Sequence, residues 1–200
     1  MILNEFQSFI EYGEDIDKIT QKLKKYTRII EIYKNNNKYL YHGNKLPNEQ
    51  WNYAYSNHTP STRIIDRDAN PRYVNYFNDW IVKKNGINTT TRDNSIFCYS
   101  NKEDTKFYSG EFGPYVVFPD NDFKFLYSLD VFDFVPWSLR IEKKIDPTQE
   151  KDQFELEFEK ATFSNSNLEL AFNNDCEILI SHCNYFLIQE SIIDSIIEKL

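Results

Sequence analysis

The chain has 200 residues, with 23 Lys and Arg against 31 Asp and Glu, which gives a formal net charge of −8. This length corresponds to one domain, and a hydrophobic content of 40% is enough for a packed core. No apolar stretch approaches the roughly 18 residues of a membrane span, so we expect no membrane association. The acidic balance argues against a protein that holds nucleic acid mainly through its phosphates.

Glycine and cysteine usage excludes further classes. The five glycines cannot be written as G-x-G-x-x-G or as G-x-x-x-x-G-K-[ST], so the common nucleotide-binding loops are absent. Cys98, Cys176 and Cys183 form neither a CxxC pair nor an even disulfide framework. The N-terminus lacks the basic start and apolar run of a secretory signal. We therefore expect a protein of the reducing cytosol.

The N-terminal half opens with a long amphipathic pattern. Apolar residues recur at helical spacing until an Asn-rich stop at residues 35–37. Pro at a first turn and Asn-Gly at the end delimit a second helix. The expected order is a helix over 3–33, a buried strand over 38–44, a long polar loop over 45–70 and a helix over 71–84.

The C-terminal part alternates short apolar runs with polar turns, which predicts strands interrupted by helices. The expected strands cover 95–100, 115–118, 123–128, 177–181 and 185–189, and the expected helices cover 102–108, 150–161 and the chain end up to residue 200. There is no internal repeat and no Gly/Ser-rich linker. We predict one α+β domain, residues 38–200, preceded by an N-terminal helical segment, residues 1–37.

Standard hydrolase and metal sites are absent from the sequence. There is no H-E-x-x-H, and Cys176, His182 and Cys183 lack metal-ligand spacing, so we expect no metal cofactor. No G-x-S-x-G marks a nucleophilic serine, and no cysteine has a flanking nucleophile signature. Cys176 and Cys183 are interpreted as small core residues.

Three segments follow one another in an order that matches a known plan. Residues 39–43 read Tyr-Leu-Tyr-His-Gly and would end a strand at His42 and Gly43. Residues 97–108 would form a strand and a short helix that begin and end with an aromatic residue. Residues 174–188 place Glu177 at the opening of a strand that is followed by a hairpin partner.

This ordered triple resembles the ADP-ribosyltransferase superfamily in its His-containing branch, that of the poly(ADP-ribose) polymerases and diphtheria-type toxins. The resemblance implies a split β-sandwich and cleavage of the nicotinamide–ribose bond of NAD. It departs from the family at three points: Phe97 stands where the polymerases have Tyr, residues 92–94 lack a glycine, and Asp175 replaces a Glu or Gln. The resemblance therefore leaves the branch and the acceptor open.

The resemblance also implies a set of site residues. A carboxylate beside the ribose stabilises the oxocarbenium-like transition state more than the ground state, and Glu177 is the candidate. The other roles are a ribose hydroxyl contact for His42, approach of the Gly43 backbone to the nicotinamide amide, stacking on the nicotinamide by Phe97 and Tyr108, and a carboxamide contact for Ser100 or Thr105. Guanidinium groups also suit the diphosphate of NAD, for which Arg67 is the candidate, with Arg63 and Arg72 in the same charged loop. The same loop could instead meet the acceptor.

Each of these residues also has an ordinary structural interpretation. Glu177 would be an exposed strand-end carboxylate, and His42 would be a satisfied core or turn histidine. Phe97 would be a core residue, and Ser100 would be a helix cap. The arginines would form a solvated, self-paired charge run.

The resulting hypothesis is an NAD-dependent mono-ADP-ribosyltransferase that modifies a macromolecular acceptor, with Glu177 and His42 as catalytic residues. The acidic net charge favours protein over nucleic acid as that acceptor. The alternatives are an NAD glycohydrolase, a catalytically inactive binding or inhibitor protein of phage origin, and a virion protein with a Tyr-rich contact surface. The Asn-rich polar loops give the sequence the look of a phage-encoded protein, for which the compartment would be the host cytoplasm.

Overall fold

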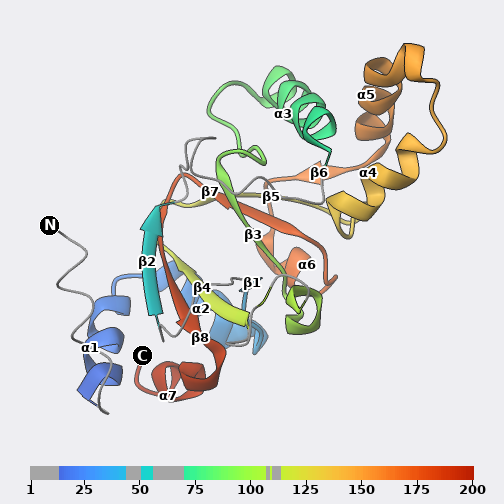
Figure 1. Cartoon of the computed structure of the whole chain (residues 1–200). Coiled ribbons are helices and arrows are strands. Elements are labelled where there is room, and N and C mark those ends of the chain that lie inside the picture. Colours follow the sequence, from blue (N-terminus) through green and yellow to red (C-terminus); the bar gives the residue numbers. More distant parts are fainter. Residues whose placement is uncertain (1–13, 44–50, 56–69, 107–108, 110–113) are drawn as a thin grey trace, which may run out of the picture.

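The structure is a computed structural model that describes residues 14–43, 51–55, 70–106, 109 and 114–200 (Figure 1). Its described strands form two four-stranded antiparallel sheets, with the strand orders β1-β4-β8-β2 and β3-β7-β5-β6. The strands are β1 (Tyr41–Gly43), β2 (Trp51–Tyr55), β3 (Ser95–Cys98), β4 (Pro114–Pro119), β5 (Lys124–Ser128), β6 (Phe163–Ser164), β7 (Ile178–Ser181) and β8 (Asn184–Gln189). The predicted α+β class is confirmed.

The two sheets meet where the end of β3 passes β1. Tyr41 and Tyr99 form an isolated antiparallel bridge, in which each backbone N–H donates to the other residue's carbonyl, at N···O distances of 2.7 and 2.9 Å. β7 and β8 follow each other directly in the chain but belong to different sheets. The short turn between them therefore also links the two sheets.

Helices flank the two sheets on opposite sides (Figure 1). α1, α2 and α7 lie beside the sheet that contains β8, and α3, α4 and α5 stand beyond the sheet that contains β7. The α-helices are α1 (Glu14–Leu23), α2 (Thr27–Asn36), α3 (Pro71–Asn85), α4 (Phe134–Glu142), α5 (Glu150–Lys160), α6 (Leu168–Phe172) and α7 (Ile193–Ile197), and the 3₁₀ turns are η1 (Lys102–Thr105), η2 (Pro147–Gln149) and η3 (Glu190–Ile192).

The sheet built on β7 is buried on both faces. Successive side chains of a strand point to opposite faces, and along β7 Ile178 and Ile180 enter a core shared with α1, α2 and the first sheet. Leu179, between them, enters a second, aromatic-rich core under α3, α4 and α5. A strand covered on both faces reads as a continuous apolar run, as β7 does.

Two sequence predictions for the N-terminal third are wrong in part. The helix expected over 3–33 is interrupted in the described part after Leu23, and a second helix begins at Thr27. Leu23 and Tyr26 both stay buried in the same core, so the apolar spacing gave no signal of the break. The loop expected over 45–70 contains β2, which pairs with β8 along its whole length.

Other elements fall close to their predicted bounds. α3 begins at Pro71 after the Asn70 side chain, which accepts a hydrogen bond from the Arg72 N–H. No prediction covers residues 129–149, where α4 is capped by the Asp133 carboxylate. The short helix expected over 102–108 is a 3₁₀ turn over its described residues 102–105.

Gly86 ends α3 in a conformation that other residues avoid, with φ 89° and ψ 168°. A Cβ there would meet no atom within 4 Å, so only the backbone conformation opposes a side chain. We expect Gly86→Ala to lower the free energy of unfolding by about 1–3 kcal/mol. Urea unfolding measures the effect, and Ile87→Ala, at the neighbouring exposed position, is the control. Equal stability of the two variants would contradict the prediction.

Candidate active site around Glu177 and His42

Glu177 lies directly before β7 and is buried, with an exposed fraction of 7%. Its backbone N–H donates to the Phe132 carbonyl oxygen at 2.8 Å. Its carboxylate accepts two hydrogen bonds from Arg92, from Nη1 to Oε2 at 2.6 Å and from Nη2 to Oε1 at 3.2 Å. The interpretation of Glu177 as an exposed strand-end residue is therefore wrong, because the carboxylate is inside the protein and bound in a fork-like ion pair.

Arg92 is the residue that holds this carboxylate, and it is only 2% exposed. The guanidinium carbon lies 4.3 Å from the centre of the Phe97 ring and 4.2 Å from that of Phe134. A guanidinium is weakly hydrated and stacks well on aromatic faces, so two rings can replace water around it. The ion pair is thus enclosed between β3 and the start of α4.

Tyr99 adds a third group to the carboxylate. Its hydroxyl lies 3.5 Å from Glu177 Oε1, and its backbone forms the bridge to Tyr41 that joins the two sheets. Oε1 therefore has two longer contacts, and Oε2 has one short contact, of 2.6 Å.

His42 approaches the same group of residues from β1. Its Nδ1 lies 2.8 Å from the Phe97 carbonyl oxygen. Because a carbonyl only accepts, Nδ1 carries the proton in this contact, and the neutral ring then has its acceptor nitrogen at Nε2. The three segments singled out in the sequence therefore meet: His42 contacts Phe97, Phe97 contacts Arg92, and Arg92 binds Glu177.

Ser100 and Thr105 are engaged in local hydrogen bonds. The Ser100 hydroxyl donates to Asp175 Oδ1 at 3.2 Å, and the Thr105 hydroxyl donates to the Lys102 carbonyl oxygen at 2.7 Å. The expectation that Ser100 caps the following helix is wrong, since the cap of η1 is Asn101. Gly43 ends β1 opposite Pro114.

The structure describes only one of the remaining candidate residues, Arg72. Arg67 and Tyr108, together with Arg63, lie outside the described residues. Arg72 lies on the first turn of α3, where its Nη1 is 3.5 Å from Glu150 Oε2.

Sequence reasoning missed Arg92, Tyr99 and Asp104. Burial raises the pKa of the Asp104 carboxyl, and the nearby Asp175 and Glu103 raise it further. Its Oδ2 is buried and has no hydrogen-bond partner in the part of the chain that the structure describes. No sequence pattern around Arg92 marks it as a site residue, because its partner Glu177 lies 85 positions further along the chain.

The cysteines are core residues, as predicted for Cys176 and Cys183. Burial raises the pKa of the Cys98 thiol well above its ordinary value and that of Cys176 to about 11. All three thiols are at most 1% exposed. We expect an aromatic disulfide reagent to label the native protein only as fast as the protein opens and exposes these thiols. The reagent reacts with the thiolate, which burial disfavours. Rapid labelling without denaturant, measured by absorbance, would contradict this.

Within the described ranges, no group of three or more His, Cys, Asp and Glu side chains is arranged to hold a metal ion. No helix of the described chain has the length and apolar character that a bilayer crossing requires.

Comparison with protein-family models, with curated proteins and with solved structures found no match.

Proposed function

We propose that this protein is an NAD-dependent mono-ADP-ribosyltransferase with the split β-sandwich fold of that superfamily. The observation that supports the proposal is the contact series from His42 through Phe97 and Arg92 to Glu177. These residues belong to segments far apart in the chain, and the resemblance in the sequence would bring the same segments to one NAD site. The proposed acceptor is a macromolecule, and the acidic chain favours a protein.

Glu177 is proposed to act on the ribose. Loss of nicotinamide develops positive charge on the sugar, and a carboxylate fixed beside it lowers the energy of that state. Arg92 holds Glu177 through the short contact to Oε2. Oε1, with its longer contacts to Arg92 and Tyr99, is the oxygen that would take a ribose hydroxyl.

His42 and Gly43 are proposed to bind the rest of the nicotinamide riboside. Nδ1 of His42 is held at the Phe97 carbonyl oxygen, and the His42 ring is the group proposed to contact a ribose hydroxyl. The Phe97 ring already has the Arg92 guanidinium on one face, at 4.3 Å. Phe97 is therefore proposed as a wall of the site, which leaves the stacking role to Tyr108.

The experiment uses the full chain, NAD labelled in the adenylate part, and a cell extract. A transferase attaches label to a macromolecule, and His42→Ala reduces that attachment. Release of free ADP-ribose without attachment would instead identify an NAD glycohydrolase. If NAD is neither consumed nor bound, the proposed enzyme is wrong.

A second candidate is a catalytically inactive binding or inhibitor protein that keeps the same fold. The observation that favours it is the enclosed Arg92–Glu177 pair, in which the carboxylate is already satisfied by protein groups. In that case Glu177 serves stability alone. Unchanged NAD together with a host protein that co-purifies with the wild-type chain would support it. For either candidate we propose the reducing cytosol, which three free cysteines favour.

A further inference from the structure

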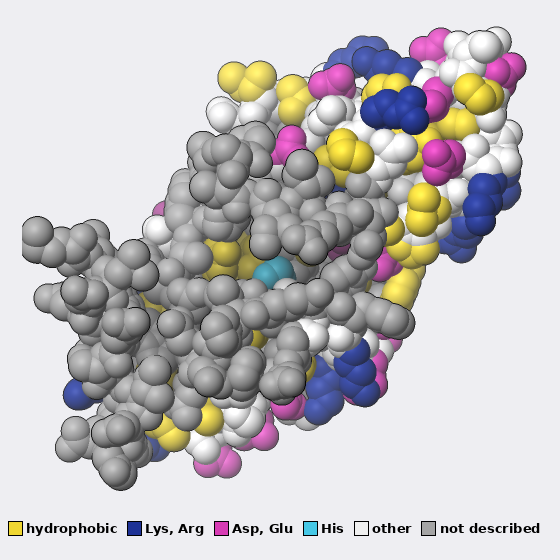
Figure 2. Space-filling view, viewed as in Figure 1, with side chains coloured by type: hydrophobic (Ala, Val, Ile, Leu, Met, Phe, Trp, Pro, Cys, Tyr) yellow, Lys and Arg dark blue, Asp and Glu magenta, His cyan; other side chains and the backbone are white. Residues whose placement is uncertain are grey.

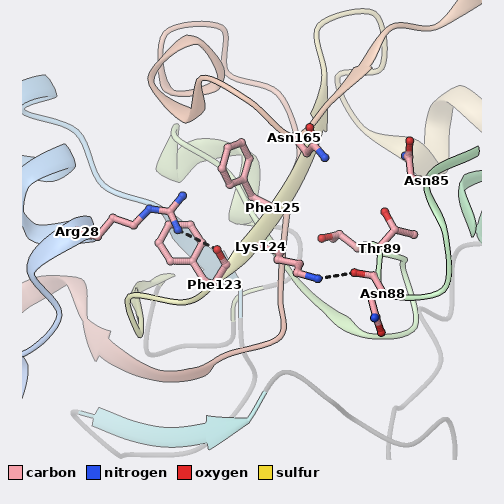
Figure 3. A pocket seen from close by; sticks show the side chains of 9 residues that line it. Arg28, Asn85, Asn88, Thr89, Phe123, Lys124, Phe125 and Asn165 are labelled. Atoms are coloured by element: carbon pink, nitrogen blue, oxygen red, sulfur yellow. Dashed lines mark hydrogen bonds between the residues drawn. The ribbon is translucent and has the colours of Figure 1, made fainter.

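A second polar site lies at the other end of β7 from Glu177. It is a cavity of about 420 Å³, lined by Arg28, Asn85, Asn88, Thr89, Thr90, Phe123, Lys124, Phe125 and Asn165 (Figure 3). The Thr90 hydroxyl lies 2.8 Å from that of Ser181, the last residue of β7. Four residues of strand, or about 13 Å, therefore separate this cavity from Glu177.

Two cations face this cavity from different elements. Arg28, on α2, donates from Nη1 to the carbonyl oxygens of Phe123 at 2.9 Å and Asn121 at 3.3 Å, and its guanidinium carbon lies 4.0 Å from the centre of the Phe123 ring. Lys124, on β5, donates from Nζ to the Asn88 carbonyl oxygen at 2.6 Å. These contacts orient both charged groups, as Figure 3 shows.

Neither cation has a carboxylate partner among the described residues. No acidic side chain belongs to the described lining of the cavity, and neither Arg28 nor Lys124 forms an ion pair in the described chain. A second cavity, of about 510 Å³ between α3 and α5, shows the opposite arrangement, because its Lys84 lies 3.2 Å from Glu159 Oε2.

The mixed charges on that side of the molecule are visible in Figure 2, where acidic and basic side chains are interspersed over α3, α4 and α5. At the Arg28–Lys124 cavity, by contrast, the described lining has two cations and no acidic side chain. Oriented cations without a carboxylate attract an anion, and phosphate oxygens match guanidinium and ammonium donors.

The rest of the cavity lining includes uncharged polar side chains. The side chains of Asn85, Asn88 and Asn165 make no hydrogen bond with the described residues, and neither does the Thr89 hydroxyl. These groups offer donors and acceptors that suit sugar hydroxyls. The cavity also has the volume of a small-molecule site rather than that of a single phosphate ion.

We propose that the cavity between Arg28 and Lys124 binds a small phosphorylated sugar, with the phosphate between the two cations and the hydroxyls on the Asn and Thr groups. This site is independent of the proposed NAD site. The probe is ribose 5-phosphate, titrated at low ionic strength into the ¹⁵N-labelled full chain. The expected shifts fall on the amides of Asn88, Thr89, Thr90 and Lys124, and ribose alone produces none.

Variants test the charge dependence. Lys124→Gln is expected to weaken ribose 5-phosphate binding by about tenfold or more, since a charge-assisted contact is lost. Lys34→Gln removes the same charge from an exposed position on α2 and should leave the affinity unchanged. Asn165→Asp keeps Arg28 and Lys124 in place and adds a negative charge to the lining, so it should also weaken binding.

Three results would overturn the proposal. The first is the absence of shifts at the cavity at millimolar probe. The second is equal binding of ribose and ribose 5-phosphate, which would exclude the phosphate contact. The third is binding of a single-stranded oligonucleotide without binding of ribose 5-phosphate, which would point to a nucleic-acid surface instead.

Discussion

Arg92→Leu is expected to lower the free energy of unfolding by about 3–5 kcal/mol, because it leaves the Glu177 carboxylate buried without its counter-charge. The pair is enclosed, with exposed fractions of 2% for Arg92 and 7% for Glu177. The Phe97 and Phe134 rings would also lose the guanidinium between them. Urea unfolding followed by circular dichroism measures the difference.

The double variant Arg92→Leu/Glu177→Leu is the informative control. Removing both charges together avoids the unpaired carboxylate, so most of the lost stability should return. Arg92→Lys keeps the charge but loses the second hydrogen bond and the planar group that stacks on the rings. Its free energy of unfolding should lie between those of the wild type and Arg92→Leu. A single Arg92→Leu variant as stable as the wild type would show that the enclosed pair is absent in solution.

Glu177→Gln is expected to reduce the turnover of NAD by on the order of 10²-fold or more, because glutamine keeps the shape and removes the charge that stabilises the ribose cation. The same change leaves the Arg92 guanidinium without its partner charge, so the variant is also less stable. Nicotinamide release must therefore be measured well below the unfolding temperature of the variant.

Glu198→Gln is the matched control for this substitution, since it removes one carboxylate from an exposed position near the chain end. It should keep both full stability and full turnover. A folded Glu177→Gln variant with wild-type turnover would remove Glu177 from the proposed catalytic role.

The sequence predicted the helices and strands well where the local residue pattern alone determines the element. α3, β4, β5, α5 and β8 all lie close to their predicted bounds, because each has a local periodicity and clear end signals. β2 was missed, since it is a short edge strand in a polar stretch and forms by pairing with β8. The break after Leu23 was missed because Tyr26 continues the apolar spacing.

The sequence predicted the segments that form the candidate site, but not the contacts between them. The strand ends at His42 and Glu177 can be identified locally, and the structure brings both to Phe97 and Arg92. The pairing of Arg92 with Glu177 depends on a contact between distant parts of the chain, which no local pattern encodes. The burial of Glu177 follows from that pair, so the sequence alone predicted an exposed carboxylate as the ordinary alternative.

The proposed NAD site is tested most directly by titrating the ¹⁵N-labelled protein with NAD and following the amide signals by two-dimensional NMR. Shifts are expected at the amides of His42, Gly43, Tyr99 and Glu177, together with a change in the His42 ring signals. Shifts confined to Thr89, Thr90 and Lys124 would show that NAD binds only through its phosphates at the Arg28–Lys124 cavity. That result, or no shifts at saturating NAD, would contradict the proposed NAD site.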